Sequence, residues 1–302
     1  MKIDLQKIRE LSNLELLARQ LVEGFITGLH KSPYHGFSVE FAEHKLYNIG
    51  ESTKNIDWKV YARTDKLFSK RYEEETNLRC TMLIDNSSSM YYPKGNHGKI
   101  TFSVMASAAI AFMLQRQRDA VGITTFSDQI ESQTPIKSTH SHLHKMLILL
   151  ENLLQSSQKE KKKTNIPEVL HQIANTIHKR SLVIIFSDMF DNHEQVQEII
   201  NALHHLKYNN HEVLLFHVTD RKTEFDFDFE ERPYNFIDLE TREELKLHPS
   251  QIKDVYVKKV NEYFQSLALK CGQFKIDFIP VDVSDDFDKV LSAYLIKRRK
   301  MN

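Results

Sequence analysis

Apolar residues recur every three or four positions through residues 4–28, and the pattern changes further along the chain. The first segment is typical of an amphipathic helix, because this spacing places apolar side chains on one face. Residues 37–41 alternate apolar and polar side chains, as a half-buried strand does, and residues 67–75 predict a second strand. Trp58, the only tryptophan, is expected to be buried among them. We therefore expect residues 1–78 to form an N-terminal helix and a small β extension packed on the rest of the chain.

From Cys80 onward, short apolar runs alternate with helix-like segments. The expected strands are residues 81–84, 120–126, 182–186, 213–218 and 274–281. The expected helices are residues 100–117, 143–154, 167–178, 194–206, 249–270 and 286–299. Alternating phenylalanine and acidic residues at 225–231 predict a further strand at the surface. Buried strands separated by helices indicate a mostly parallel sheet flanked by helices, so residues 79–302 are predicted to form an α/β, Rossmann-like domain.

Two of the predicted strands end in an aspartate, Asp85 and Asp188. Ligands of open parallel sheets bind beyond the carboxyl ends of the strands, so we expect the functional site there. The motif Asp85-x-Ser87-x-Ser89 lies in a turn that can direct one carboxylate and two hydroxyls at one point. Thr164 precedes a predicted helix and adds a hydroxyl from a second loop. Oxygen ligands of this kind suit a hard cation such as Mg²⁺.

The charge of such a site also predicts what it attracts. One carboxylate and two neutral hydroxyls leave much of the +2 charge of the ion uncompensated. The ion would therefore attract an external carboxylate or phosphate.

The pattern resembles the metal-ion-dependent adhesion site of von Willebrand factor A domains. In that family an Asp-x-Ser-x-Ser loop, a threonine on a second loop and an aspartate on a third hold Mg²⁺ or Mn²⁺. The resemblance implies that Asp188 binds through water or orients the ligand shell. It also implies direct or water-mediated coordination by Asp85, Ser87, Ser89 and Thr164. The sequence departs from the family at Asp188-Met189, where Asp-Gly is common.

A series of further segments, most of them upstream of this loop, points to one particular family. The segments are, in order, His30-Lys31-Ser32-Pro33, Gly36, Glu40-Phe41, Tyr47-Asn48-Ile49-Gly50, Ile56-Asp57-Trp58, Ala62-Arg63 and, much later, Phe236-Ile237-Asp238-Leu239-Glu240-Thr241. The series is similar to the bacterial domain-of-unknown-function family 58, whose members carry a von Willebrand A-like domain. This resemblance covers roughly residues 25–300. It implies association with MoxR-type AAA+ ATPases in an adaptor or chaperone-like role, and it implies no known reaction.

The composition mainly excludes certain classes of protein and of binding site. Lys and Arg total 41 and Asp and Glu total 41, which argues against a generally basic nucleic-acid binder. The two cysteines, Cys80 and Cys271, exclude a disulfide framework and a four-cysteine zinc site, and they fit a reducing compartment. No run approaches the ~18 apolar residues of a membrane span. The start of the sequence is charged and lacks an apolar signal segment. We therefore expect a cytoplasmic protein without a membrane span.

Other chemistries draw on the same residues. A metal-dependent hydrolase or phosphoryl-transfer enzyme would use the cation as a Lewis acid, but it needs a base or nucleophile near the ion. The residues around Ser87 do not form a Gly-x-Ser-x-Gly elbow. The run Gly95-Asn96-His97-Gly98-Lys99 has its glycines too close for a phosphate loop, and we interpret it as a loop before a helix. Alternation at His140, His142 and His144 favours a solvated helix start over a zinc site.

The favoured function is metal-ion-dependent protein binding without catalysis. A carboxylate of the partner would complete the octahedron around the ion. A metal-free scaffold is the third alternative.

Overall fold

The computed structural model describes residues 14–28, 43–46, 58–71, 78–93, 98–155, 165–190, 196–239 and 243–285. The chain divides into two compact units, one formed by residues 1–30 and 78–302 and the other by residues 31–77. The expected packing of the β extension on the core stays a prediction.

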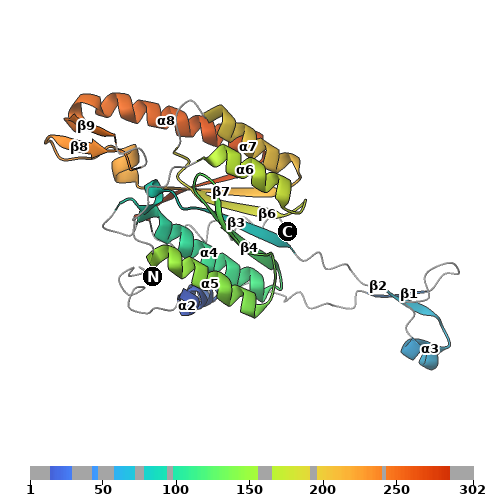
Figure 1. The fold of residues 1–302 in the computed structure, drawn as a ribbon. Coiled ribbons are helices and arrows are strands. Elements are labelled where there is room, and N and C mark those ends of the chain that lie inside the picture. The colour runs from blue at the N-terminus through green and yellow to red at the C-terminus, as the bar shows by residue number, and fades with distance from the viewer. Residues whose placement is uncertain are drawn as a thin grey trace. The chain divides into compact units, whose positions relative to one another are not determined.

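The larger unit is built on a six-stranded sheet with the strand order β10-β7-β6-β3-β4-β5. All neighbouring strands are parallel except the antiparallel pair of β4 and β5 (Figure 1). In chain order the strands are β3 (Arg79–Asp85), β4 (Ala120–Phe126), β5 (Ile130–Gln133), β6 (Leu182–Ser187), β7 (Glu212–Thr219) and β10 (Asp277–Asp282). This order confirms the α/β, Rossmann-like fold predicted from the sequence. It also makes β3 and β6 neighbours, so their carboxyl ends meet at one edge of the sheet.

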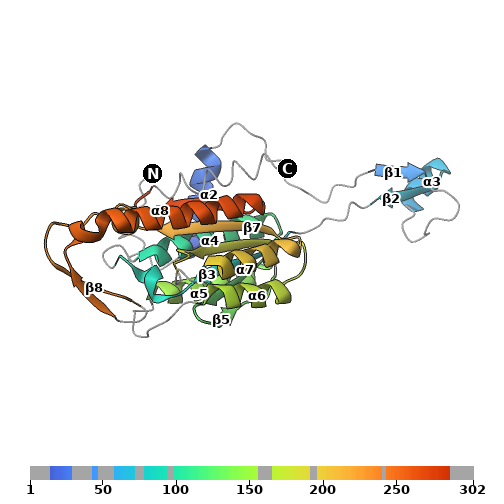
Figure 2. The same cartoon turned by 90° about the horizontal axis from the view of Figure 1, so that it is seen from above.

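Helices cover both faces of the sheet (Figures 1 and 2). One face carries α2 (Leu14–Gly28), α4 (Gly98–Arg116) and α5 (His140–Gln155). The other carries α6 (Ile166–Thr176), α7 (Val196–Tyr208) and α8 (Pro249–Gln273). Successive strand residues point to opposite faces. Met82 and Ile84 of β3 therefore join the cluster under α4, and Leu83 joins the cluster under α6 and α7.

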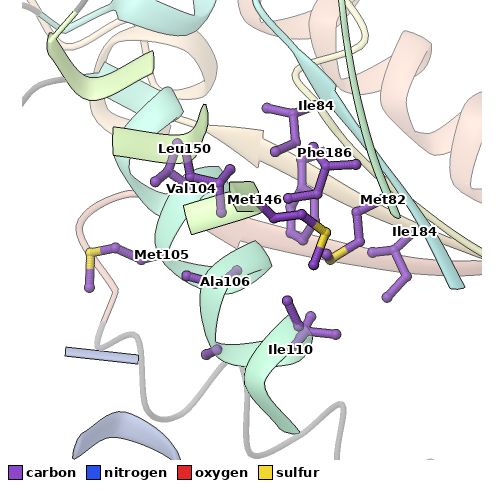
Figure 3. Packing of buried hydrophobic residues seen from close by; sticks show 14 of the residues in the cluster. Met82, Ile84, Val104, Met105, Ala106, Ile110, Met146, Leu150, Ile184 and Phe186 are labelled. Carbon is purple, nitrogen blue, oxygen red and sulfur yellow. The ribbon is translucent and has the colours of Figure 1, made fainter. Parts of the chain in front are cut away.

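Helix α4 lies at the centre of the first of these clusters (Figure 3). It is buried along nearly its whole length, and four alanines between Ala106 and Ala111 allow close packing. Within the described ranges, α4 is the one helix that is long and apolar enough to cross a membrane, but 83% of that window is buried inside the protein. The expectation that no segment reaches this length and apolarity is thus wrong. The expected cytoplasmic localisation stays a prediction.

The smaller unit contains a hairpin and a short helix. Strand β1 (Glu43–Leu46) pairs antiparallel with β2 (Phe68–Arg71), and α3 is Trp58–Thr64. The position of β2 agrees with the strand expected at 67–75. Within this unit Trp58 is 62% exposed and meets Tyr61 edge-on, so its expected burial depends on the packing of the extension on the core and stays a prediction. A two-stranded hairpin with one short helix offers too little apolar surface to cover an indole.

The segment between β7 and α8 differs from its prediction. It begins with the π-helix η5 (Arg221–Phe225) and ends in the antiparallel pair β8 (Tyr234–Ile237) and β9 (Glu244–Leu247). The strand expected at 225–231 is wrong, because no strand lies between η5 and β8. Instead, Phe227 packs on Phe236 and Tyr256, with ring centroids 5.6 and 4.5 Å apart. Phe227 and Phe229 thus belong to a local aromatic cluster and not to one face of a sheet, while Phe225 stacks on Phe264.

Several expectations fall outside the described residues. They are the strand at 37–41, the last helix at 286–299, the start of the first helix and the position of Thr164. The remaining expected strands and helices are present, with β10 beginning later than expected because α8 continues to Gln273.

Candidate metal centre at the carboxyl ends of β3 and β6

The loop after β3 gathers the side chains of the Asp-x-Ser-x-Ser motif. Oδ1 of Asp85 accepts a hydrogen bond of 2.9 Å from the backbone N–H of Ser87. A bond of this kind closes an Asx turn, and the 3₁₀ helix η2 (Ser88–Tyr91) follows at once. The hydroxyl oxygens of Ser87 and Ser89 lie 3.0 Å apart. Local turn geometry therefore brings together the three residues that the sequence singled out.

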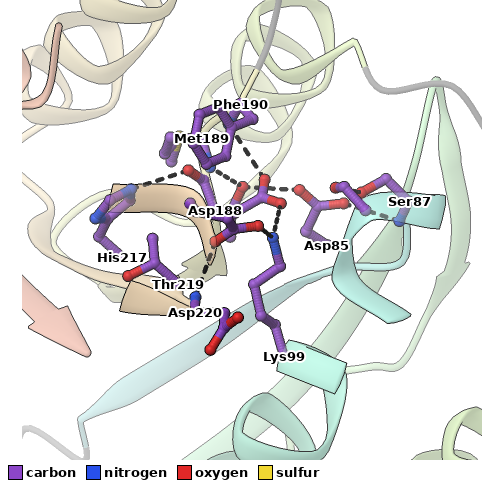
Figure 4. Close-up of polar contacts among 12 residues, drawn as sticks. Asp85, Ser87, Lys99, Asp188, Met189, Phe190, His217, Thr219 and Asp220 are labelled. Carbon is purple, nitrogen blue, oxygen red and sulfur yellow. Dashed lines mark hydrogen bonds and ion pairs between the residues drawn. The ribbon is translucent and has the colours of Figure 1, made fainter. Parts of the chain in front are cut away.

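The carboxylate of Asp85 is fully buried and has neutral hydrogen-bond partners. Its Oδ2 accepts a bond of 2.7 Å from the hydroxyl of Ser187, the last residue of β6 (Figure 4). Burial, followed by the nearby charge of Asp188, raises the pKa of Asp85 to about 7, although hydrogen bonds from Ser187 and Ser87 oppose the rise. A cation beside this carboxylate would offset the cost of burying its charge.

Asp188 follows β6 and has a different set of partners. Its Oδ1 accepts a hydrogen bond of 3.2 Å from the N–H of Phe190. Its Oδ2 lies 2.7 Å from Nζ of Lys99, and the side chains of Lys99 and Asp188 are 0% and 1% exposed. Both carboxylate oxygens of Asp188 are thus engaged, one of them by a buried cation (Figure 4).

Lys99 and Glu224 belong to this site, and the sequence analysis missed both. The ammonium of Lys99 also donates a hydrogen bond to Oε1 of Glu224 in η5. Burial alone would lower the pKa of Lys99, but the carboxylates of Asp188 and Glu224 outweigh burial and raise it above its ordinary value. The available signal was a single lysine at the head of an otherwise uncharged, apolar stretch in α4. No local signal marks Glu224, which lies among other acidic residues.

Gly98 positions Lys99. Its φ of +71° is in the left-handed region, and a Cβ there would lie 2.4 Å from the backbone carbon of Tyr91. The N–H of Lys99 donates a hydrogen bond of 3.1 Å to the carbonyl of Tyr92. The start of α4 is therefore held against the end of η2. Residues 98 and 99 belong to the helix and not to the loop that was expected before it.

Met189 occupies the position where related sites commonly carry glycine. Its φ is +50°, a conformation that favours glycine. Two hydrogen bonds hold it there: its N–H donates to the hydroxyl of Ser187 at 2.9 Å, and its carbonyl accepts from the hydroxyl of Tyr263 at 2.6 Å. The departure from Asp-Gly thus leaves the backbone conformation of the loop in place.

His217 of β7 contacts the backbone of this loop. Its Nε2 lies 2.9 Å from the carbonyl oxygen of Asp188, and its ring packs on Phe264 and Phe278 with centroids 4.2 and 5.3 Å apart. Burial lowers the pKa of His217 to about 4, against the pull of Asp188. The imidazole is therefore neutral at pH 7 and donates to the backbone of the site.

The residues present fit a hard divalent cation. Two ligands at right angles and ~2.1 Å from Mg²⁺ lie about 3.0 Å apart, which matches the separation of the two serine hydroxyls. Oδ1 of Asp85 accepts the N–H of Ser87 and Oδ2 accepts the hydroxyl of Ser187, and a carboxylate has about four lone-pair sites, so capacity remains for an ion. Among the described residues, no group of three or more His, Cys, Asp or Glu side chains is arranged to hold a metal. A cation here would therefore depend on hydroxyl ligands beside Asp85.

The three alternating histidines take different positions at the start of α5. His140 and His144 are exposed and lie 3.7 and 3.3 Å from the carboxylate of Glu15. His142 is buried, with Nε2 3.1 Å from the carbonyl of Val121. The expected solvated helix start is correct for the first two and wrong for His142.

The fold and the site define the class of protein: a mostly parallel, Rossmann-like α/β domain with a buried carboxylate and hydroxyls at the carboxyl ends of its central strands. The family model described as "Protein of unknown function DUF58" matches residues 43–265, and the chain belongs to that family. This confirms the family resemblance drawn from the sequence. The association with MoxR-type ATPases stays a prediction.

Among curated proteins, the chain is similar to the uncharacterized protein Rv1480 of Mycobacterium tuberculosis, with 24% identity over 178 residues. The uncharacterized protein Mb1516 of Mycobacterium bovis matches with the same identity and length. In each case the match covers 59% of this chain and 56% of the relative. The chain thus spans a little over half the length of these relatives.

Among solved structures, the chain is similar to the conserved hypothetical protein BatB from Bacteroides thetaiotaomicron, with 15% identity and a TM-score of 0.44 over 74% of this chain and 99% of that one. An aerotolerance-related membrane protein from Bacteroides fragilis gives 13% identity and a TM-score of 0.47 over 74% and 100%. The SpRpn10 VWA domain gives 11% and 0.37 over 71% and 94%.

Proposed function

We propose that this chain is a protein-binding module that contacts its partner through a divalent cation, Mg²⁺ or Mn²⁺. Asp85, Ser87 and Ser89 hold the ion, and Thr164 joins them from the loop before α6. Asp188 acts through water or by orienting the ligand shell. A carboxylate from the partner completes the octahedron.

One observation carries this proposal: a fully buried carboxylate with neutral partners stands beside two hydroxyl oxygens 3.0 Å apart. Burying a carboxylate without a counter-charge is costly, so proteins rarely keep one unless it serves a purpose. A divalent cation bound by Asp85 and the two serines would supply the missing charge and use the hydroxyl lone pairs.

The charge of the site favours an anionic partner group. Asp85 contributes one formal negative charge to the ion, while Asp188 already shares the ammonium of Lys99. The ion would keep a positive excess, which a carboxylate of the partner would neutralise. By family resemblance, we favour a MoxR-type AAA+ ATPase as the partner, with this chain as its adaptor or chaperone-like companion.

Partner capture tests the proposal. The purified chain is immobilised and exposed to a candidate MoxR-type ATPase in Mg²⁺ or in chelator. We expect capture in Mg²⁺ only, and we expect Asp85→Ala to reduce capture in Mg²⁺ to the chelator level. Asp282→Ala is the matched control, because Asp282 also ends a strand and its Oδ1 accepts a 2.9 Å bond from the N–H of Ser284. Equal capture in Mg²⁺ and in chelator would contradict a metal-dependent contact.

The enzymatic alternative is tested separately. The imidazole of His217 lies beside Asp188. It is buried and hydrogen-bonded to a backbone carbonyl, so we assign it no proton-transfer role. A phosphatase and esterase screen in Mn²⁺ should give no turnover that Asp85→Ala abolishes. Turnover lost in that variant would favour a metal-dependent hydrolase.

A further inference from the structure

The strand-end site already contains a cation of its own, the ammonium of Lys99. We infer that Lys99 holds Asp188 out of direct coordination to the divalent ion, so that Lys99 sets both the affinity and the ligand set of the site. This inference rests on the cation site proposed above. It assigns Lys99 a positioning role that acts through Asp188.

The contacts of Asp188 support the first step. Its Oδ2 is 2.7 Å from Nζ of Lys99, and its Oδ1 accepts the N–H of Phe190. An ion on Oδ2 would either stand beside the ammonium on the same carboxylate, where the two positive charges repel each other, or replace the ammonium. The ammonium is 0% exposed, so it would lose a charged partner without gaining water.

The contacts of Lys99 support the second step, because the ammonium is held from its other side as well. Oε1 of Glu224 accepts a hydrogen bond from the ammonium, and Oε2 of Glu224 accepts a hydrogen bond of 2.8 Å from the N–H of Asp220. The ring of Phe190 lies 5.7 Å from Nζ. Glu224 and Asp188 thus hold the ammonium between them. Lys99 therefore keeps its position when a divalent cation binds nearby.

Two consequences follow for ion binding. Asp188 contributes little to the affinity while Lys99 is present, because its charge is already used. Removing Lys99 should release Asp188 toward the ion and tighten binding.

A charge-matched variant separates this effect from a simple change in net charge. In Lys99→Met with Glu224→Gln, one positive and one negative charge are lost together, so the site keeps the net charge of the wild-type chain. We expect the double variant to bind Mn²⁺ about tenfold more tightly or better in calorimetric titration. Circular dichroism and a thermal melt establish that each protein is folded. Glu224→Gln alone, which keeps the lysine, should show no such gain.

Asp188→Asn is introduced into the wild-type chain and into the double variant, which completes a double-mutant cycle. It should weaken Mn²⁺ binding by less than about threefold in the wild-type chain and by about tenfold or more in the double variant. Equal losses in the two chains, or a large loss in the wild-type chain alone, would overturn the inference. If the double variant fails to fold, the effect of Asp188→Asn on Mn²⁺ binding by the wild-type chain still decides the question.

The outcome is distinguishable from failure of the proposed function. If wild-type binding is undetectable but the double variant binds Mn²⁺, the role of Lys99 is supported and the metal-dependent function is overturned. If the double variant gains no affinity, the inference about Lys99 is wrong, whatever partner capture shows.

Discussion

Asp85 ends β3 and Asp188 directly follows the neighbouring strand β6, yet their surroundings differ in kind. Asp85 accepts hydrogen bonds from Ser87 and Ser187, both neutral, and burial raises its pKa to about 7. Asp188 shares the buried ammonium of Lys99. One half of the site therefore lacks a counter-charge, and the other half contains one.

The difference shows that strand ends alone do not determine what a carboxylate does. Parallel topology brings both aspartates to one edge, but their partners differ. Asp85 accepts a hydroxyl from β6 and the backbone N–H of Ser87, whereas Asp188 pairs with an ammonium from α4. We therefore expect the same chemical change at the two positions to have opposite effects on stability.

The largest effect should come from removing the counter-charge of Asp188. Lys99→Met leaves Asp188 and Glu224 buried without their cation, which should lower the free energy of unfolding by about 3–5 kcal/mol. Urea unfolding at pH 7 measures the loss, and adding Glu224→Gln should restore part of it. Lys145→Met, at an exposed lysine of α5, is the control and should change stability little. A loss no larger than that of the control would show that the ion pair does not stabilise the fold.

The next effect concerns the half without a counter-charge, and it depends on pH. The pKa of Asp85 rises from an ordinary 3.8 to about 7 on folding, so the folded chain keeps a proton that the unfolded chain releases. Below pH 4 both states are protonated and the group contributes nothing. Between pH 4 and 7 the wild-type chain loses stability, and above pH 7 the loss stays at its maximum. In chelator at pH 8, Asp85→Asn should therefore stabilise the chain, by on the order of 4 kcal/mol.

The matched change at the other strand end should have the opposite sign. Asp188→Asn removes a charged partner of Lys99 and should destabilise the chain at pH 8. Urea unfolding of both variants at pH 5 and pH 8 makes the comparison. If both asparagines stabilise the chain, the distinction between the two carboxylates fails.

The smallest effect concerns the residue that connects the two halves. The hydroxyl of Ser187 donates to Asp85 and accepts from the N–H of Met189. Ser187→Ala should therefore cost about 1 kcal/mol in stability, and it should raise the pKa of Asp85 further. Thermal unfolding in chelator gives the first quantity, and the pH dependence of stability gives the second. An unchanged pH dependence would show that Ser187 does not stabilise the charged form of Asp85.

The local part of the site could be predicted from the sequence, as could the order of its elements. Asp85, Ser87 and Ser89 lie within five residues, so a single turn after an apolar strand places them together whatever the rest of the chain does. The apolar runs and their spacing likewise indicated a parallel sheet covered by helices, because strand and helix periods differ and can be distinguished in a sequence.

The tertiary structure alone decided which charges meet. Lys99 and Asp188 are 89 positions apart, and Lys99 and Glu224 are 125 apart. The apolar residues at 100–117 predicted a helix there, but not that the lysine just before them reaches past the end of β6 to an acidic residue beyond β7. The aromatic cluster around Phe227 was also decided by packing. A short motif depends on the local backbone, whereas the partner of a buried charge depends on the three-dimensional arrangement of the whole sheet and its helices.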